Sequence, residues 1–393
     1  MKKHTLFLFL LLLTIASCID NEELKLAQSA AAEVKSQFVP DRRVNIFDTE
    51  IIRAKDGLIV KGETNLPAAK ELLLQKIQEI NPNAVDSIEV LPAADLEGQT
   101  YGVVRLSVCN IRSKPKHSAE LSTQALLGSS LRIYKKTGDW YYVQTPDDYL
   151  GWLDKDGLTL MSEATYNAWM QEEKIIVTAN TTRAKATADL EGEIVSDLLP
   201  GNILAKRGVE GDFEKVVFPD GREAFILRDY QSDLNAWLEN TKPDTTRIFQ
   251  TAKRMMGSPY LWGGTSSKGM DCSGYTKQIF FENGILLPRD ASQQVHVGEE
   301  IETDTTLVNL LPGDLLFFGR KATAEKKERI WHVAIYLGAG KIIHSAGNVK
   351  IQSLRRGDED FAEDRLETFV RAKRILGSEG KNNVKWLKET AFY

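Results

Sequence analysis

The sequence lacks the features that mark several classes of protein. Only three of its 393 residues are cysteine, too few for a framework of disulfide bonds. Its 50 lysine and arginine residues are outnumbered by 55 acidic residues, so the basic surface of a nucleic-acid-binding protein is missing and no nucleic-acid partner is expected. A second long apolar run is also missing, which excludes a protein that crosses a membrane repeatedly. The apolar content of 42% instead indicates a globular chain, whose length corresponds to about two to four domains.

The one long apolar run lies at the N-terminus and has the features of an export signal. Two lysines precede the apolar residues at positions 6–13, a stretch too short to span a membrane. The sequence Ile-Ala-Ser-Cys that ends at Cys18 resembles a bacterial lipobox. This resemblance implies a lipoprotein signal peptide over residues 1–17 and lipidation of Cys18, with ordinary cleavage nearby as the alternative. The expected location is therefore the bacterial cell envelope, with the protein lipid-anchored on the periplasmic or cell-surface face.

Residues 18–95 are expected to form a small α+β unit without chemistry of its own. Apolar residues recur at helical spacing in two stretches, and apolar-rich runs between and after them indicate strands. The expected helices are 21–38 and 67–80, and the expected strands are 44–53, 58–63 and 87–91. The first two strands should form a hairpin, because they are joined at Asp56-Gly57.

An internal repeat with an offset of 73 residues follows, in segments 96–161 and 162–240. Gly-Asp-Trp at 138–140 recurs as Gly-Asp-Phe at 211–213, and three further pairs have the same offset: Gly128 and Gly201, Val143 and Val216, Trp152 and Phe225. A constant offset predicts two copies of one structural unit. Short strands broken by Gly, Asp and Pro are typical of small β-barrels. The strands of the first copy resemble bacterial SH3-like domains, and the second copy is a more diverged match.

Residues 241–393 contain a cysteine and two histidines in a pattern typical of nucleophilic catalysis. Cys272 follows Asp271 at the start of a segment with helical spacing, and the partial positive charge of a helix N-terminus stabilises a thiolate. A cysteine nucleophile needs a base and a group that orients the base. His332 and His344 lie in two apolar strands joined by Gly-Ala-Gly at 338–340, so they can meet across a hairpin.

Other interpretations of the same residues remain open at this point. Cys272 and the two histidines could be buried structural residues. They could also form a Cys/His/His zinc site, although no fourth ligand has a suitable spacing. Cys109 occupies an apolar position of a barrel strand and is expected in the core. A disulfide between Cys109 and Cys272 would block the nucleophile.

Four motifs make the resemblance to a known family specific. Tyr-x-Trp-Gly-Gly, Asp-Cys-Ser-Gly, Pro-Gly-Asp-Leu and His-Val-Ala-Ile-Tyr-Leu-Gly occur in order, and together they resemble the NlpC-type cell-wall cysteine peptidases over residues 245–375. The resemblance implies a papain-like α+β catalytic domain that needs no metal or organic cofactor. It also implies that Cys272 is the nucleophile, His332 the base, His344 the polar third residue, and Tyr260 a hydroxyl on the oxyanion side.

Two SH3-like domains ahead of an NlpC-type domain resemble the γ-D-glutamyl-L-diamino acid endopeptidases, which cleave peptidoglycan stem peptides that begin with a free L-alanine. The resemblance implies that Asp271 holds the free amine and that Ser273 and Ser292 bind the D-glutamyl part. Glu120 and Tyr149 of the first SH3-like domain would close the site, with Tyr142 as a rival for Tyr149.

The complete expectation is a multidomain envelope enzyme. It combines an α+β N-terminal unit, two SH3-like β-barrels and a C-terminal papain-like α+β catalytic domain, and it acts as a monomer in turnover of murein fragments. Two other functions remain open. One is a cell-wall-binding lipoprotein with weak or degenerate catalysis. The other is a Cys/His acyltransferase or amidase that acts on another envelope substrate. The third residue of the stem peptide, lysine or diaminopimelate, is also open.

Overall fold

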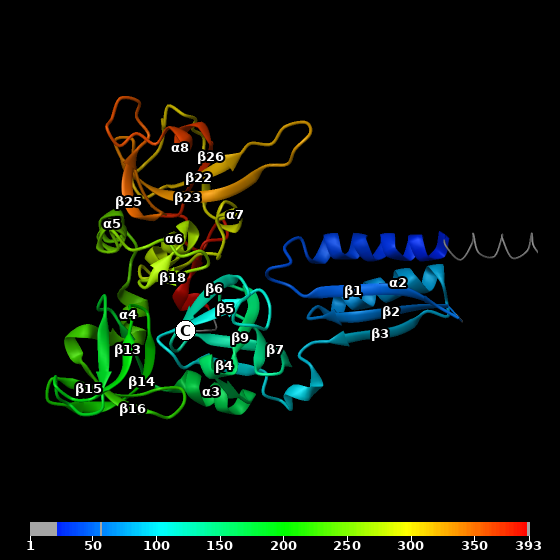
Figure 1. Cartoon of the computed structure of the whole chain (residues 1–393), viewed down its shortest axis with the longest axis horizontal. Coiled ribbons are helices and arrows are strands. Elements are labelled where there is room, and N and C mark those ends of the chain that lie inside the picture. The colour runs from blue at the N-terminus through cyan, green and yellow to red at the C-terminus, as the bar shows by residue number, and fades with distance from the viewer. Residues whose placement is uncertain (1–21, 56, 391–393) are drawn as a thin grey trace, which may run out of the picture. The chain divides into compact units, whose positions relative to one another are not determined.

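The computed structural model describes residues 22–55 and 57–390, which fall into two compact units divided between Glu97 and Gly98 (Figure 1). The lipobox and Cys18 lie outside the described residues. Within the described ranges, no helix is both long enough and apolar enough to cross a membrane.

The first unit is a three-stranded sheet with two helices. A helix over residues 22–38 precedes β1 (Phe47–Ala54), β2 (Gly57–Thr64), α2 (Pro67–Ile80), β3 (Val85–Val90) and the short η1 (Ala94–Leu96). β1 is antiparallel to β2, and β3 is parallel to β2, so α2 is the crossover between two parallel strands. Apolar residues of the first helix, α2 and the sheet form one core, including Val34, Leu73 and Val60. Helix α2 has the bounds that the sequence predicts, whereas β1 starts three residues later than predicted.

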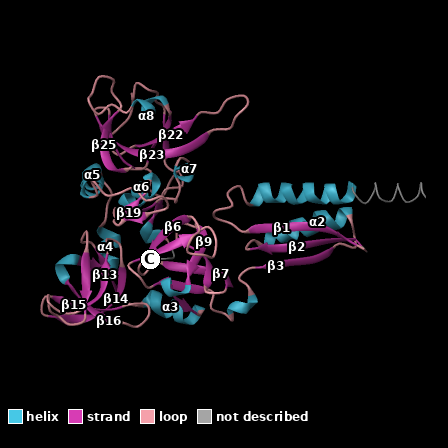
Figure 2. Cartoon of the chain, in the orientation of Figure 1, coloured by secondary structure: helices cyan, strands magenta, loops and turns pink. Residues whose placement is uncertain are grey.

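The second unit begins with two seven-stranded antiparallel sheets. The first contains β4 (Tyr101–Val104), β5 (Val108–Arg112), β6 (Leu121–Leu126), β7 (Ser130–Thr137), β8 (Trp140–Gln144), β9 (Leu150–Asp154) and β10 (Leu158–Met161). The second contains β11 (Lys174–Val177), β12 (Thr182–Lys185), β13 (Ile194–Leu198), β14 (Ile203–Glu210), β15 (Phe213–Val217), β16 (Glu223–Leu227) and β17 (Gln231–Asp233). Figure 2, with strands in magenta, shows how few helices interrupt these sheets.

The two sheets have the same strand order. Reading from one edge, the first is β10-β4-β7-β8-β9-β5-β6 and the second is β17-β11-β14-β15-β16-β12-β13. The short turns η2 (Lys155–Gly157) and η3 (Arg228–Tyr230) also occupy equivalent places after β9 and β16. The offset of 73 residues in the sequence is therefore the separation between equivalent strands, as for β7, which starts at Ser130, and β14, which starts at Ile203.

The two sheets contact each other directly through hydrogen bonds of backbone and side-chain groups. The Ile203 N–H donates to the Leu127 carbonyl at 2.9 Å, and the Asn202 side chain donates to the Ser107 carbonyl at 2.9 Å. Gly128 lies at this contact with φ +83°, and a Cβ there would lie 2.4 Å from the Ile203 carbonyl oxygen. Any other residue would therefore separate the sheets. Helices α3 (Glu163–Gln171) and α4 (Leu234–Asn240) follow the first and second sheet respectively.

The C-terminal part of the second unit is a six-stranded antiparallel sheet covered by helices. Its strand order is β21-β26-β22-β23-β24-β25. The strands are β21 (Glu299–Ile301), β22 (Leu315–Arg320), β23 (Arg329–Gly338), β24 (Lys341–Ala346), β25 (Asn348–Ser353) and β26 (Phe369–Arg374). The helices are α5 (Thr245–Arg254), α6 (Cys272–Phe281), α7 (Ala291–Gln294) and α8 (Glu363–Glu367). Four short strands, β18 (Thr265–Ser266), β19 (Gly269–Met270), β20 (Ile285–Leu286) and β27 (Lys385–Trp386), and the turn η4 (Leu387–Glu389) complete it.

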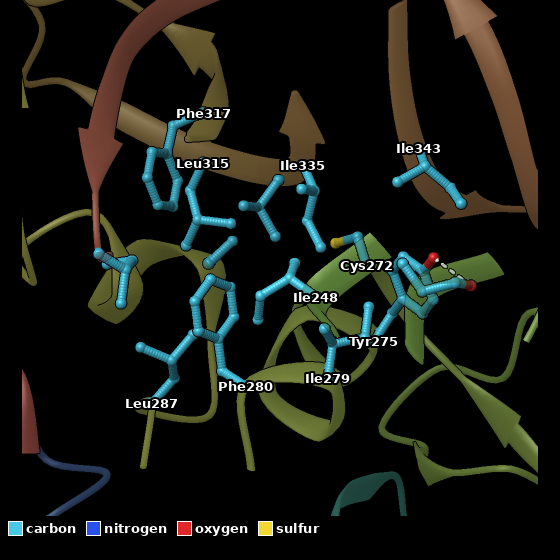
Figure 3. Packing of buried hydrophobic residues seen from close by; sticks show 14 of the residues in the cluster. Ile248, Cys272, Tyr275, Ile279, Phe280, Leu287, Leu315, Phe317, Ile335 and Ile343 are labelled. Carbon is cyan, nitrogen blue, oxygen red and sulfur yellow. Dashed lines mark hydrogen bonds between the residues drawn. The ribbon is translucent and has the colours of Figure 1, made fainter. Parts of the chain in front are cut away.

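Alternate side chains of β22 pack into two separate hydrophobic cores, one on each face of this sheet. Leu315 and Phe317 pack with residues of α5 and α6, as Figure 3 shows for Ile248, Ile279 and Phe280. Leu316 and Phe318 pack with α8 and β26 on the opposite face. Neighbouring side chains of a strand point to opposite faces of its sheet. Because residues 315–318 of β22 are apolar without alternation, both faces of the sheet must be covered. Cys272 belongs to the core on the α6 face.

Candidate active site

Cys272 lies at the first position of helix α6, where the sequence predicts it. The Asp271 side chain caps this helix, because its Oδ1 accepts the Gly274 N–H at 2.7 Å. The helix start packs tightly against the glycine-rich loop at residues 260–264. A Cβ on Gly274 would lie 2.0 Å from the Gly264 carbonyl oxygen. The glycines of both motifs therefore allow the loop to approach the nucleophile's helix.

The thiol of Cys272 is buried, and its protonation differs from the thiolate that the sequence predicts. The residue is 7% exposed, and in Figure 3 the sulfur points toward Ile335. Burial, and next the charge of Asp271, raise the pKa of Cys272 to about 11, although the N–H groups of Val333 and Ser273 oppose this shift. Loss of hydration therefore outweighs the helix terminus, and the thiol is neutral in the free protein.

His332 and His344 meet across the β23–β24 hairpin, as the sequence predicts. His332 Nε2 lies 2.7 Å from His344 Nδ1, and His344 Nε2 lies 2.9 Å from Oε1 of Gln352 on β25. Register shifts in β23 at Tyr336–Gly338, beside the tight turn, bring the two rings together on adjacent strands. Gln352 was not anticipated from the sequence, because a lone glutamine in a strand carries no signal.

Both histidines are held in the neutral form. Burial is the main cause for each, and it lowers the pKa of His344 to about 4 and the pKa of His332 well below its usual range. Positive charges on Arg365 and Lys350 act in the same direction. A neutral imidazole has a free lone pair, so His332 is available as a base at neutral pH.

Two alternatives from the sequence find no support in these contacts. Cys109 and Cys272 are both free, so the disulfide between them is wrong. Cys109 instead contacts the Gly157 carbonyl oxygen at 3.0 Å within the first sheet, as expected for a core residue. Over residues 22–55 and 57–390, no group of three His, Cys, Asp or Glu side chains is arranged to hold a metal ion. In the same ranges, no hydrogen bond joins the Cys272 thiol to His332 in the substrate-free state, a bond that often forms only with substrate present.

Tyr260 lies beside the nucleophile and keeps its proton. Burial, and next the charges of Cys272 and Asp271, raise the pKa of Tyr260 to about 12, which places its phenol in the same electrostatic environment as the thiol. The Tyr260 N–H donates to the Gly347 carbonyl at 2.9 Å, which fixes this end of the loop beside β24. A half-buried phenol that stays protonated can donate a hydrogen bond to a developing oxyanion.

Asp271 is already paired, which differs from the amine-binding role that the resemblance implies. Arg289 contacts both of its carboxylate oxygens, with Nη2 at 2.6 Å from Oδ2 and Nη1 at 3.1 Å from Oδ1. Oδ2 also accepts the Gly263 N–H at 3.0 Å, and Asp271 is 6% exposed. Both oxygens of this carboxylate therefore accept hydrogen bonds from the protein, and through them Asp271 positions the loop and the helix. Its contact with a substrate amine stays a prediction.

Arg289 also connects this pair to Ser273. Its Nη1 donates to the Ser273 hydroxyl oxygen at 3.0 Å, and its side chain is 1% exposed. Arg289 and Asp290 belong to the segment that contains Ser292, but no local pattern in the sequence predicts a role for either of them. Their contacts come from residues far away in the chain, so only the folded structure identifies them. Ser292 itself is half-buried in α7.

Two loop residues beside strands of the first sheet form hydrogen bonds with the catalytic domain, and each bond involves a carboxylate. The Tyr149 hydroxyl donates to Asp290 Oδ2 at 3.0 Å, and the Trp262 indole N–H donates to Glu120 Oε1 at 2.7 Å. The structure therefore brings Tyr149 to this junction and places Glu120 there as well. The rival Tyr142 packs on Trp152 within its own sheet, with ring centroids 5.0 Å apart.

Comparisons with known proteins agree with this geometry. Residues 257–368 match the NlpC/P60 family, and residues 111–158 match the bacterial dipeptidyl-peptidase SH3 domain. The chain is 33% identical over 258 residues to the γ-D-glutamyl-L-lysine dipeptidyl-peptidase of Bacillus subtilis, an alignment that covers 64% of this chain and 78% of that enzyme. This chain belongs to the NlpC/P60 family of cysteine peptidases. The enzyme of the same name from Bacillus cereus is 30% identical over 241 residues, which are 58% of this chain and 67% of that one.

The fold of this NlpC/P60 peptidase is also shared with a solved structure. The crystal structure of an NlpC/P60 family protein from Bacillus cereus superimposes with a TM-score of 0.58 and 24% identity, and the match covers 70% of this chain and 99% of that one. At this level of identity the similarity shows the fold. The family, the SH3 domain and the fold thus agree with a multidomain cysteine peptidase.

The raised pKa of Cys272 gives a first prediction for this peptidase. Alkylation by iodoacetamide requires the thiolate, which is scarce at neutral pH when the pKa is about 11. At pH 7.5 we expect Cys272 to react on the order of 10²-fold more slowly than an ordinary exposed thiol, and its rate to rise steadily toward pH 11. Peptide mass mapping distinguishes it from Cys109. A fast reaction with a midpoint below pH 7 would instead indicate a preformed thiolate–imidazolium pair.

Proposed function

We propose that this peptidase hydrolyses the bond between γ-D-glutamate and the diamino acid in peptidoglycan stem peptides that begin with a free L-alanine. Two relatives with 30% and 33% identity are named γ-D-glutamyl-L-lysine dipeptidyl-peptidases, and the SH3 match is to a domain of bacterial dipeptidyl-peptidases. The observation that carries the proposal is that two carboxylates, Glu120 and Asp290, each accept a hydrogen bond between the first SH3-like domain and the catalytic domain.

The chemistry proceeds from two neutral groups. As the Cys272 sulfur attacks the γ-carbonyl carbon, its proton passes to the free ring nitrogen of His332. His332 then gives this proton to the leaving amine of the diamino acid, which breaks the C–N bond and leaves a thioester. His332 next takes a proton from water, whose oxygen attacks the thioester, and returns the proton to the departing Cys272 thiolate. General acid–base assistance of this kind contributes about 10²–10⁴-fold.

Two further groups complete the reacting centre. The Tyr260 phenol donates a hydrogen bond to the oxygen of the tetrahedral intermediate. One preorganised donor of this kind stabilises the transition state by about 3 kcal/mol. His344 holds the His332 ring through the 2.7 Å contact between their nitrogens. The oxygen that gains charge is thus stabilised by a group that keeps its own proton up to a pH of about 12.

Recognition of the dipeptide requires groups for both of its charged ends. Glu120 and Asp290 supply negative charge for the ammonium of L-alanine, with Tyr149 and Trp262 holding them in place. Ser273 and Ser292 supply hydroxyl groups for the D-glutamyl part, and Ser273 lies next to the positive charge of Arg289. Asp271 keeps Arg289 and the start of α6 in position, a role that replaces the amine contact implied by the resemblance.

The proposed enzyme also has a second SH3-like domain and a lipid anchor. Residues 174–233 have the strand order of the first sheet, which supports a second SH3-like domain. Cys18 carries a lipid anchor, and the protein works as a monomer in the bacterial cell envelope on released murein fragments. No organic cofactor or metal takes part in the steps above.

A pair of peptides tests the proposed specificity. The full-length protein is incubated with L-Ala-γ-D-Glu-diaminopimelate and with its N-acetyl form, and mass spectrometry follows both. We expect cleavage of the free-amine peptide at a rate roughly 10²-fold above the acetylated one, because an acetylated amine carries no positive charge to pair with the exposed Glu120 and the half-buried Asp290. The lysine-containing peptide is compared in parallel to determine the preferred third residue.

The matched controls separate specificity from chemistry. The combined variant Glu120→Gln and Asp290→Asn removes both charges and should reduce the preference for the free amine, while it leaves Cys272 intact. Equal rates on free, acetylated and wall-attached peptides would contradict the amine site. If neither peptide is cleaved and the protein stays on insoluble cell wall, the wall-binding alternative is supported instead.

A further inference from the structure

Three polar side chains on adjacent strands form a hydrogen-bonded row that ends in an amide. His332 on β23 contacts His344 on β24, and His344 contacts Gln352 on β25, with distances of 2.7 and 2.9 Å. His332 and His344 are buried, and Gln352 is half-buried. The strands hold the row rigidly, because β24 pairs with β23 on one side and β25 on the other.

The chemistry of the amide determines where the protons of the row lie. An amide oxygen can only accept a hydrogen bond, so the His344 nitrogen that faces Gln352 Oε1 must carry the proton. A neutral imidazole has one proton, so the other His344 nitrogen, Nδ1, accepts. The partner nitrogen, Nε2 of His332, must then donate. This leaves the lone pair of His332 on Nδ1, the form that a base requires.

We infer that Gln352 is a positioning residue that selects the proton-accepting tautomer of His332 through His344. The inference rests on the roles proposed for Cys272 and His332 above. Gln352 touches neither substrate nor sulfur, and no proton moves onto it during the reaction. When His332 takes the thiol proton on Nδ1, its Nε2–H continues to donate to His344, whose Nε2–H continues to donate to Gln352.

The opposite orientation of the amide would have the opposite effect. If the Gln352 NH₂ group faced His344, both hydrogen bonds would reverse, and the His332 nitrogen left over would carry a proton. That tautomer cannot accept the thiol proton. The orientation of one side-chain amide therefore decides whether the base is competent, which makes the inference open to direct measurement.

An amide at this position also keeps the row free of charge. The charged groups that act on the two rings are Arg365 and Lys350, which lower the histidine pKa values, and Asp364, which raises that of His344. Gln352 orients the rings without adding to these charges. A carboxylate in its place would also accept from His344, but its negative charge would favour the imidazolium and raise the pKa of both histidines.

Two substitutions in the full-length protein test the inference. Gln352→Met has similar length and no hydrogen-bonding group, so the histidines should lose their fixed tautomers, and kcat should fall about 10- to 100-fold with KM little changed. Gln352→Glu can only accept, so it should retain kcat within a few-fold of the parent. When the pH is lowered, kcat/KM of Gln352→Glu should begin to fall at a higher pH than kcat/KM of the parent.

Histidine tautomers are read directly by ¹⁵N NMR of the protein labelled at histidine. We expect His332 and His344 to carry their protons on Nε2 in the parent and in Gln352→Glu, and to show mixed tautomers in Gln352→Met. A parent His344 protonated on Nδ1 would overturn the inference whatever the activities are. Full kcat in Gln352→Met, or loss of kcat in a folded Gln352→Glu, would also overturn it.

Two controls distinguish this inference from the proposed function. Gln231→Met, at a half-buried glutamine of β17 in the second sheet, makes the same chemical change away from the row and should leave kcat and the pH profile unchanged. Retained activity in Cys272→Ala would contradict the proposed function, whereas the tautomer measurement does not depend on turnover. The two ideas can therefore fail separately.

Discussion

Replacing Cys272 by alanine should reduce peptide hydrolysis on the order of 10⁶-fold, because the covalent intermediate cannot form without the sulfur. The other groups at the site do not compensate. His332 is a neutral base with nothing to deprotonate except water, and Tyr260 can only stabilise an oxyanion that some nucleophile has produced. The rate is measured with the free-amine stem peptide at substrate concentrations well above KM, so that the loss is a loss of kcat.

The second free cysteine supplies a matched control for this substitution. Cys109 is 3% exposed, and its pKa is raised to about 12, mainly by burial, so it resembles Cys272 in burial and in protonation. It lies in the first sheet, where it contacts Gly157. In the sequence it is far from His332 and His344. Cys109→Ala should cost about 1 kcal/mol of stability and leave kcat unchanged. Turnover that survives in Cys272→Ala, or that disappears in Cys109→Ala, would contradict the assignment of the nucleophile.

Local sequence signals predicted the elements that carry the chemistry. The helix that begins at Cys272 could be anticipated because Asp271 is a good cap and the following residues have helical spacing. The histidine hairpin could be anticipated because Gly-Ala-Gly separates two apolar runs. In both cases the signal lies within a few residues of the element that it determines. The 73-residue repeat is a longer signal of the same kind, since equivalent strands follow at a constant distance.

Interactions between distant residues could not be predicted in this way. Asp271 was assigned to the substrate amine, but Arg289 approaches from 18 positions later and occupies both oxygens. The thiolate expected at the helix N-terminus is opposed by burial among Ile335, Val333 and their neighbours, which no local pattern reveals. Gln352 and the contact between Trp262 and Glu120 belong to the same class, because each needs two segments to meet in the folded chain.

Replacing Arg289 by methionine should lower the stability of the catalytic domain by about 3 kcal/mol, because it leaves a buried carboxylate without its counter-ion. Burial alone lowers the pKa of Arg289, but the charge and hydrogen bonds of Asp271 raise it above its usual value, so the guanidinium stays charged. The Asp271 side chain is 8% exposed and the Arg289 side chain 1%, so water cannot replace the lost contact. Amide hydrogen exchange of helix α6 measures the effect as a lower free energy of opening.

A double substitution separates the cost of the unpaired charge from the cost of lost packing. Asp271→Asn keeps an oxygen for the Gly274 N–H and removes the negative charge, so adding it to Arg289→Met should recover part of the lost stability. If the two losses simply add, the charge pair is not what stabilises this region. Arg254→Met is a matched control, since Arg254 pairs with Glu282 but is 28% exposed and lies outside the proposed site. It should cost less and leave KM unchanged, whereas Arg289→Met should raise KM because the Ser273 hydroxyl loses the guanidinium that donates to it.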